Sequence, residues 1–142
     1  MDKQSLLLAA LSAGGTYQHT PVQVQKLIFL IERNVAGDLG GPTFEFKAYD
    51  YGPFDSSIYE VLRGLETQGL AVSAPTSRGW KKYQLTEAGV AEGARFLGQL
   101  PNRAADYVRN VSDFVRRLSF AELVSSIYKA YPEMKANSVF RD

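Results

Sequence analysis

The sequence predicts a mostly helical α+β domain. Apolar side chains recur at helical spacing over most of the chain, while residues 44–49, 70–74 and 80–85 are typical of strands. Between residues 21 and 99 the predicted order is helix, strand, helix, hairpin and helix, which is a winged helix-turn-helix with a β-hairpin wing. The length of 142 residues and the lack of a long linker indicate a single winged-helix domain over residues 1–142. Its core is expected at about 20–100, and extra C-terminal helices form an extension at about 102–131.

The first part of the chain predicts two helices, a strand and a third helix. Residues 5–11 are a short apolar helix, and Thr20, Pro21 and Gln23 form a capping box with proline at the first helical position. The centre of that second helix, residues 27–31, is apolar on all sides, so we expect a buried central helix. Residues 44–49 alternate as a strand does, residues 50–54 form a turn, and Asp55 caps the next helix.

The second part predicts the wing and three more helices. Residues 75–79 are expected to be the loop between the strands at 70–74 and 80–85. Thr86 caps a helix that reaches about residue 100, and residues 103–118 form an amphipathic helix. Ser119 and Glu122 form a second capping box, and Pro132 ends the last helix.

Composition excludes several chemistries. The chain has no cysteine and one histidine, His19, and neither of its glycine pairs has the spacing of a phosphate-binding loop. We therefore expect no catalytic residue, no metal site and no cofactor, hence a protein that is not an enzyme. No apolar run is long enough for a membrane span or a standard export signal, so we expect a soluble, cytoplasmic protein.

The wing and the helix before it resemble those of bacterial winged-helix regulators. The resemblance lies in residues 58–70, with a Leu-Glu-Thr-Gln-Gly-Leu helix exit, and in Tyr-Gln-Leu-Thr-Glu-Ala-Gly at residues 83–89. It implies a sequence-specific DNA-binding regulator whose second helix reads bases and whose wing contacts phosphates. The side chains that would make these contacts are Ser56, Ser57, Tyr59, Arg63, Arg78, Lys81 and Lys82.

Charge weakens the DNA-binding interpretation. Residues 32–66 hold seven acidic and three basic side chains, and the helix that would read the bases has only Arg63 against Asp55, Glu60 and Glu66. Phosphate neutralisation supplies most non-specific DNA affinity, so an acidic reading helix opposes binding. A dimer could still bind through its wings. The basic helix at residues 103–117 is better explained by Asp113 pairing with Arg109 and Arg117 along a solvated face.

Aromatic residues gather in one short segment. Tyr49, Tyr51 and Phe54 surround Gly52 and Pro53, and this composition fits a packed turn. It also fits a partner-binding surface, because Tyr and Phe are enriched at the centres of protein interfaces.

A second resemblance covers most of the chain from about residue 20. Gln-Lys-Leu-Ile-Phe-Leu at residues 25–30, Tyr-Asp-Tyr-Gly-Pro-Phe at 49–54 and Tyr-Lys-Ala-Tyr-Pro at 128–132 together resemble the Panacea-domain (SocA-like) proteins. The resemblance implies an antitoxin, or an adaptor in a toxin–antitoxin or phage-related module, that acts by protein–protein contact. The expected partner is a protein such as a toxin, with Tyr51, Gly52 and Pro53 as the matching motif.

The C-terminal region leaves two alternatives open. The apolar stripes of the last two helices fit either the core of a monomer or the interface of a homodimer. Val139 and Phe140 near the end either dock onto the domain or are offered to a partner.

Overall fold

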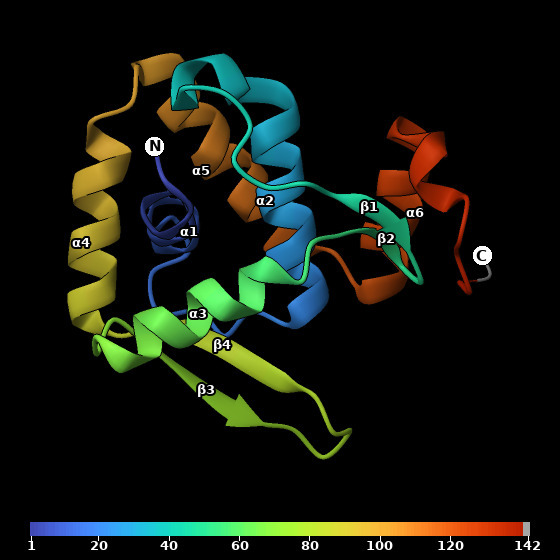
Figure 1. The fold of residues 1–142 in the computed structure, drawn as a ribbon, viewed down its shortest axis with the longest axis horizontal. Helices are drawn as coiled ribbons and strands as arrows, with labels where there is room; N and C mark the ends of the chain where they lie inside the picture. Colours follow the sequence, from blue (N-terminus) through green and yellow to red (C-terminus); the bar gives the residue numbers. More distant parts are fainter. Residues whose placement is uncertain (141–142) are drawn as a thin grey trace.

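The computed structural model describes residues 1–140, and the fold is α+β and mostly helical, as predicted (Figure 1). The helices are α1 (Lys3–Ser12), α2 (Pro21–Val35), α3 (Ser57–Thr67), α4 (Glu87–Gly98), α5 (Asn102–Arg117) and α6 (Phe120–Ala130), with 3-10 turns η1 (Ala36–Leu39) and η2 (Pro132–Lys135). The strands are β1 (Lys47–Tyr49), β2 (Gly52–Phe54), β3 (Ala71–Pro75) and β4 (Lys81–Leu85). Residues 141–142, which the predicted domain includes, lie outside the described residues. No helix among residues 1–140 combines the length and apolar character that a membrane crossing requires.

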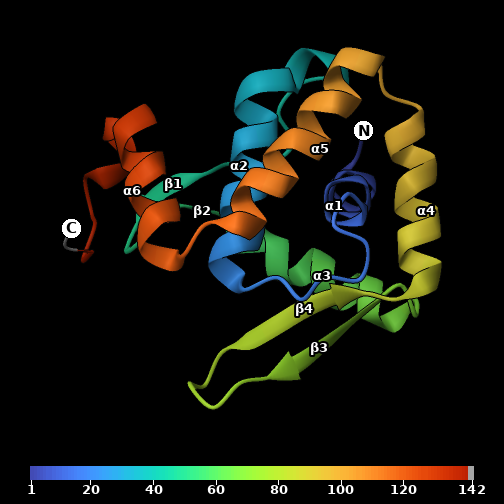
Figure 2. The same ribbon diagram turned by 180° about the vertical axis from the view of Figure 1, so that it is seen from behind.

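Helix α1 lies in the interior, seen end-on between α4 and the α2–α5 pair (Figures 1 and 2). All residues from 5 to 11 are buried, so this helix has no solvent-facing side. Helix α4 can approach it closely because Gly93 has no side chain: a Cβ there would lie 2.2 Å from the Leu8 carbonyl oxygen. The contact therefore depends on glycine at this position.

Helix α2 is the central element, as its apolar centre predicts. Leu27, Ile28 and Ile31 are fully buried, and α5 packs along α2 (Figure 2). The predicted capping box is confirmed: Gln23 N–H donates to Thr20 Oγ1 at 3.2 Å, and Thr20 N–H donates to the Gln23 side chain at 2.8 Å. These bonds satisfy backbone donors that the first helical turn leaves free.

The predicted hairpin is confirmed as β3 and β4, which pair antiparallel with Ala71 opposite Leu85 and Pro75 opposite Lys81. It lies beneath α3, and its loop extends away from the helices (Figure 1). The predicted cap at Thr86 is also confirmed, because its side chain accepts the Gly89 N–H at 3.1 Å.

The segment before α3 differs from the prediction. The strand predicted at residues 44–49 begins only at Lys47, because Glu32 takes the backbone N–H groups of Thr43 and Phe44. The turn predicted at residues 50–54 was wrong in extent, since a second strand begins at Gly52 and forms a hairpin with β1.

The start of α3 also differs from the prediction. Asp55 was expected to be the N-cap, but Ser56 occupies that position. The Asp55 carboxylate still accepts the Ser57 N–H at 2.8 Å, so it stabilises the first turn from one residue earlier.

Helix α6, the turn η2 and the tail lie beside the β1–β2 hairpin (Figure 1). The predicted capping box at Ser119 and Glu122 is confirmed. The tail docks, since Val139 N–H donates to the Asp50 carbonyl at 2.9 Å and the Tyr128 hydroxyl donates to Ser138 Oγ at 2.7 Å.

The ion pairs predicted along α5 are half correct. Arg117 pairs with Asp113 at 2.9 Å, whereas Arg109 pairs with Asp106 at 3.3 Å and leaves Asp113 to Arg117. Both pairs lie on the exposed side of the helix, as a solvated charged face requires.

Candidate functional site

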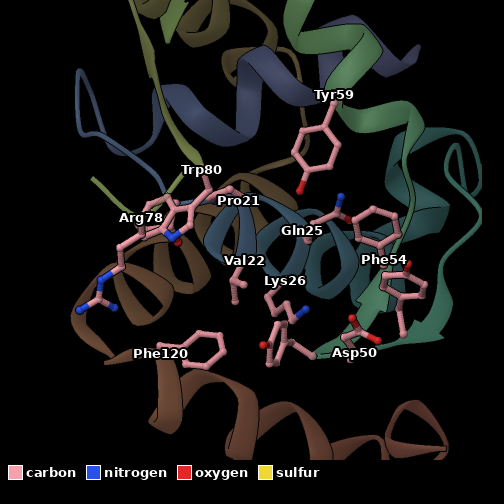
Figure 3. A pocket seen from close by; sticks show the side chains of 14 residues that line it. Pro21, Val22, Gln25, Lys26, Asp50, Phe54, Tyr59, Arg78, Trp80 and Phe120 are labelled. Carbon is pink, nitrogen blue, oxygen red and sulfur yellow. The ribbon is translucent and has the colours of Figure 1, made fainter. Parts of the chain in front are cut away.

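A pocket of about 580 Å³ opens between the start of α2, the β1–β2 hairpin, α3, the β3–β4 loop and the start of α6 (Figure 3). Six of its fourteen lining residues are aromatic: Tyr49, Tyr51, Phe54, Tyr59, Trp80 and Phe120. Lys26 lies near its middle, with Arg78 and Trp80 on one side and Asp50 and Phe54 on the other (Figure 3). Its volume is within the range of 300–1,000 Å³ typical of ligand sites.

Lys26 is the least expected residue of the pocket. Its side chain is 3% exposed, and its Nζ donates a hydrogen bond of 3.3 Å to the Pro53 carbonyl oxygen. Burial lowers the pKa of the Lys26 ammonium from 10.5 to about 7. The charged form is therefore poorly solvated in this position.

The backbone beside Lys26 requires glycine. Gly52 has a φ of 103°, which non-glycine residues rarely adopt. A Cβ there would lie 3.5 Å from Lys26 Cε and 3.3 Å from the Tyr128 ring. Gly52 thus lets the hairpin lie close to both side chains, and its neighbour Pro53 supplies the carbonyl that Lys26 binds.

Two more buried polar residues of α2 hold the segment in place. Gln25 accepts the Asp55 N–H and donates to the Asp55 carbonyl, both at 3.0 Å, which fixes the start of α3. Glu32 accepts the N–H groups of Thr43 and Phe44, and burial raises its pKa. Successive turns of α2 therefore bind the backbone of residues 43–55.

Two rings of the predicted partner-binding set are exposed. Tyr49 is 53% exposed and Tyr51 is 41% exposed, whereas Phe54 is half-buried and Gly52 and Pro53 are buried. Tyr49 stacks on Phe54 at 4.9 Å between centroids, and the Tyr51 ring meets Phe120 edge-on at 5.1 Å. Gly52 and Pro53 thus form the packed part of the hairpin, and Tyr49 and Tyr51 form its exposed part.

The residues predicted to bind DNA differ in exposure and in their contacts. Ser56 and Arg63 are exposed on α3, but Ser57 binds Asp55 and Lys3. Tyr59 was expected to face bases, yet it is half-buried, with its centroid 6.0 Å from that of Phe54.

The basic residues of the wing also divide between two environments. Arg78 and Lys81 are exposed, and Lys82 is partly buried. Arg78 additionally lines the aromatic pocket, together with its neighbour Trp80 (Figure 3).

His19 is buried rather than solvated. It is 1% exposed, its two ring nitrogens have no hydrogen-bond partner within residues 1–140, and its backbone pairs with Tyr83. Burial lowers the pKa of His19 from 6.5 to about 4. No group of three His, Cys, Asp or Glu side chains within those residues could hold a metal ion.

No family model matches the chain, and no curated protein matches it. The function is therefore inferred from the sequence and from the geometry of the site.

Sequence reasoning named residues 49–54 but missed the α2 residues beneath them. Lys26 was noticed only within a motif, and Gln25 and Glu32 were not singled out. A signal was present: Gln25 and Glu32 flank the apolar block at residues 27–31 and are seven residues apart, so they lie on one face of the helix. Polar residues at buried helical positions need partners, and here the partner is the hairpin backbone.

Proposed function

We propose that this protein is a non-enzymatic winged-helix binding protein, an antitoxin or adaptor that recognises a partner protein through the β1–β2 hairpin and the pocket beside it. In this proposal α3, the β3–β4 hairpin and α4 are the winged-helix elements. Recognition takes place on a neighbouring surface, formed by Tyr49, Tyr51, Gly52, Pro53 and Phe54.

The observation that carries the proposal is the contact between Lys26 and the Tyr-Gly-Pro segment. These are the two most specific elements of the resemblance to Panacea-domain proteins, and they are far apart in sequence. Here Lys26 Nζ binds the Pro53 carbonyl and Gly52 packs against the same side chain. The two motifs thus form one structural unit beneath the exposed tyrosines. Their contact gives a structural reason for both motifs to occur in one chain, which supports the resemblance.

Composition of the surface also supports protein binding. Exposed tyrosines beside a tryptophan and an arginine are the residue types that dominate binding energy in protein interfaces. The acidic side chains of α3, Glu60 and Glu66, disfavour a phosphate backbone on this helix.

The test is a tagged pull-down from the native host, with and without nuclease. We expect one protein at near-equal amount after nuclease treatment, and its loss by about tenfold or more in the Tyr49→Ala/Tyr51→Ala variant. Phe114→Ala is the matched control, because Phe114 is a similarly exposed aromatic residue on α5, outside the pocket. Unchanged capture by the tyrosine variant would show that the partner binds elsewhere.

A second candidate function is DNA binding by the wing. It is favoured by the extended β3–β4 hairpin, which carries exposed Arg78 and Lys81. Charge reversal of Arg78, Lys81 and Lys82 should abolish binding to the protein's own promoter if this function operates. Unchanged affinity and unchanged salt dependence would exclude it, and a discrete co-purifying DNA fragment without a protein would favour it.

A further inference from the structure

The aromatic rings do not explain why a lysine lies at the bottom of the pocket. An ammonium group has three N–H donors. Within residues 1–140, the one hydrogen bond found for Lys26 Nζ is to the Pro53 carbonyl. Two donors therefore remain for a group that enters the pocket.

No carboxylate of the described chain neutralises Lys26. The ion pairs of residues 1–140 all lie elsewhere: Arg33–Glu133, Arg95–Glu92, Arg103–Asp38, Arg109–Asp106 and Arg117–Asp113. Asp50 lines the same pocket, yet it forms no ion pair with Lys26. Buried lysines are rare unless they are paired, so the missing partner is the informative observation.

The surroundings of Lys26 favour an anion with an apolar body. Arg78 adds a second cation at the wall, and Thr20 and Pro21 place the positive end of α2 there. Val22, Trp80 and Phe120 supply apolar surface around these charges. The pocket is larger than a carboxylate needs, which leaves room for the neighbouring apolar group.

We propose that the pocket receives an Asp or Glu side chain of the partner protein, flanked by an aromatic or aliphatic residue. The carboxylate accepts hydrogen bonds from Lys26 Nζ, and the flanking side chain packs on Phe120 and Trp80. The inference rests on the proposed function, because it specifies which chemistry of the partner enters the pocket.

The experiment uses a random dodecapeptide phage library, panned in parallel on the wild-type protein, on Lys26→Met and on Tyr49→Ala/Tyr51→Ala. The peptide most enriched on the wild type is then synthesised with its acidic residue and with the matching amide, Glu→Gln or Asp→Asn. Affinities of both peptides for both proteins are measured by calorimetry. The peptide substitution needs no change in the protein, so it tests the contact even where a variant folds poorly.

We expect enriched peptides to carry an acidic residue beside an apolar one. The amide peptide should bind the wild type about tenfold more weakly than the acidic peptide, since a charge-assisted hydrogen bond is lost. Lys26→Met should bind both peptides equally. Such non-additivity places the carboxylate at Lys26.

Other results overturn the inference and separate it from the proposed function. If the enriched peptides lack acidic residues and do not bind Tyr49→Ala/Tyr51→Ala, the proposed partner surface is supported and the proposed carboxylate contact is refuted. Acidic peptides that bind Lys26→Met as tightly as the wild type refute the contact. If peptides are enriched no more on the wild type than on Tyr49→Ala/Tyr51→Ala, both proposals are refuted.

Discussion

The contact between α1 and α4 and the contact between α2 and the β1–β2 hairpin follow opposite rules. In the first, apolar side chains and backbone meet without a buried charge, and Gly93 lets the helices touch. In the second, three buried polar side chains of α2 bind a loop backbone, and a pocket remains beside Lys26.

This difference separates a contact that stabilises the fold from the contact where we propose that recognition takes place. A closed apolar contact gains from every atom it buries. A buried ammonium with one hydrogen bond opposes folding, because it loses water without gaining a counter-ion. The α1–α4 contact thus stabilises the fold, whereas Lys26 is a destabilising group beside the pocket that we propose a partner enters.

The largest expected effect is at the α1–α4 contact. Gly93→Ala would place a Cβ 2.2 Å from the Leu8 carbonyl oxygen and 2.6 Å from Ser12 Cβ, so the helices must separate. We expect the free energy of unfolding to fall by about 4 kcal/mol, at the upper end of overpacking effects. Urea unfolding followed by circular dichroism measures it.

Gly98→Ala is the control on the same helix. Nothing lies within 4 Å of the Cβ that it would add, so only helix propensity changes, and stability should rise slightly. Similar losses in both variants would mean that α4 does not depend on close approach to α1.

The next effect has the opposite sign, at the hairpin contact. Lys26→Met keeps a similar apolar stem and removes the ammonium group, and we expect about 2 kcal/mol of additional stability at pH 7. Lys129→Met, at an exposed position of α6, should be near neutral. A stability loss in Lys26→Met as large as that of Gly93→Ala would erase the contrast between the two contacts.

The gain should also depend on pH. Because the pKa of Lys26 is about 7 in the folded protein and 10.5 otherwise, the unfolded chain binds the extra proton between these values. Wild-type stability therefore rises with pH across that window relative to Lys26→Met, and the advantage of the variant shrinks.

The sequence predicted local features of the chain better than contacts between distant segments. Helix caps at Thr20, Thr86 and Ser119 were predicted correctly because a cap is a local arrangement of three or four residues. The hairpin β1–β2 was not predicted. It depends on the close approach of Gly52 to Lys26 and Tyr128, which lie on helices distant in sequence. Tyr51, Gly52 and Pro53 were named from composition and motif. That Lys26 has N–H donors without an acceptor within residues 1–140 is visible only in the structure.

The third and smaller effect is a loss of stability at low pH caused by His19, which lies beside the hairpin β3–β4. Its pKa is about 4 in the folded protein and 6.5 otherwise, so the unfolded chain binds more protons as pH falls between these values. We expect wild-type stability to fall by about 1.5 kcal/mol from pH 6.5 to pH 5, relative to His19→Leu. Parallel urea titrations at the two pH values measure it. Identical pH slopes for the two proteins would mean that His19 takes up its proton without unfolding.

The smallest effect tests whether the tail belongs to the recognition side. Tyr128→Phe removes the hydroxyl that donates to Ser138 Oγ, and Tyr107→Phe removes one that donates to the Leu30 carbonyl between α5 and α2. Each variant should lose about 1 kcal/mol, so stability alone does not distinguish them. Hydrogen exchange does: only Tyr128→Phe should speed exchange at the Val139 N–H, which binds Asp50 beside the pocket. Equal exchange in the two variants would mean that the tail is held by Phe140 packing on Phe120 instead, and that pocket and tail are independent.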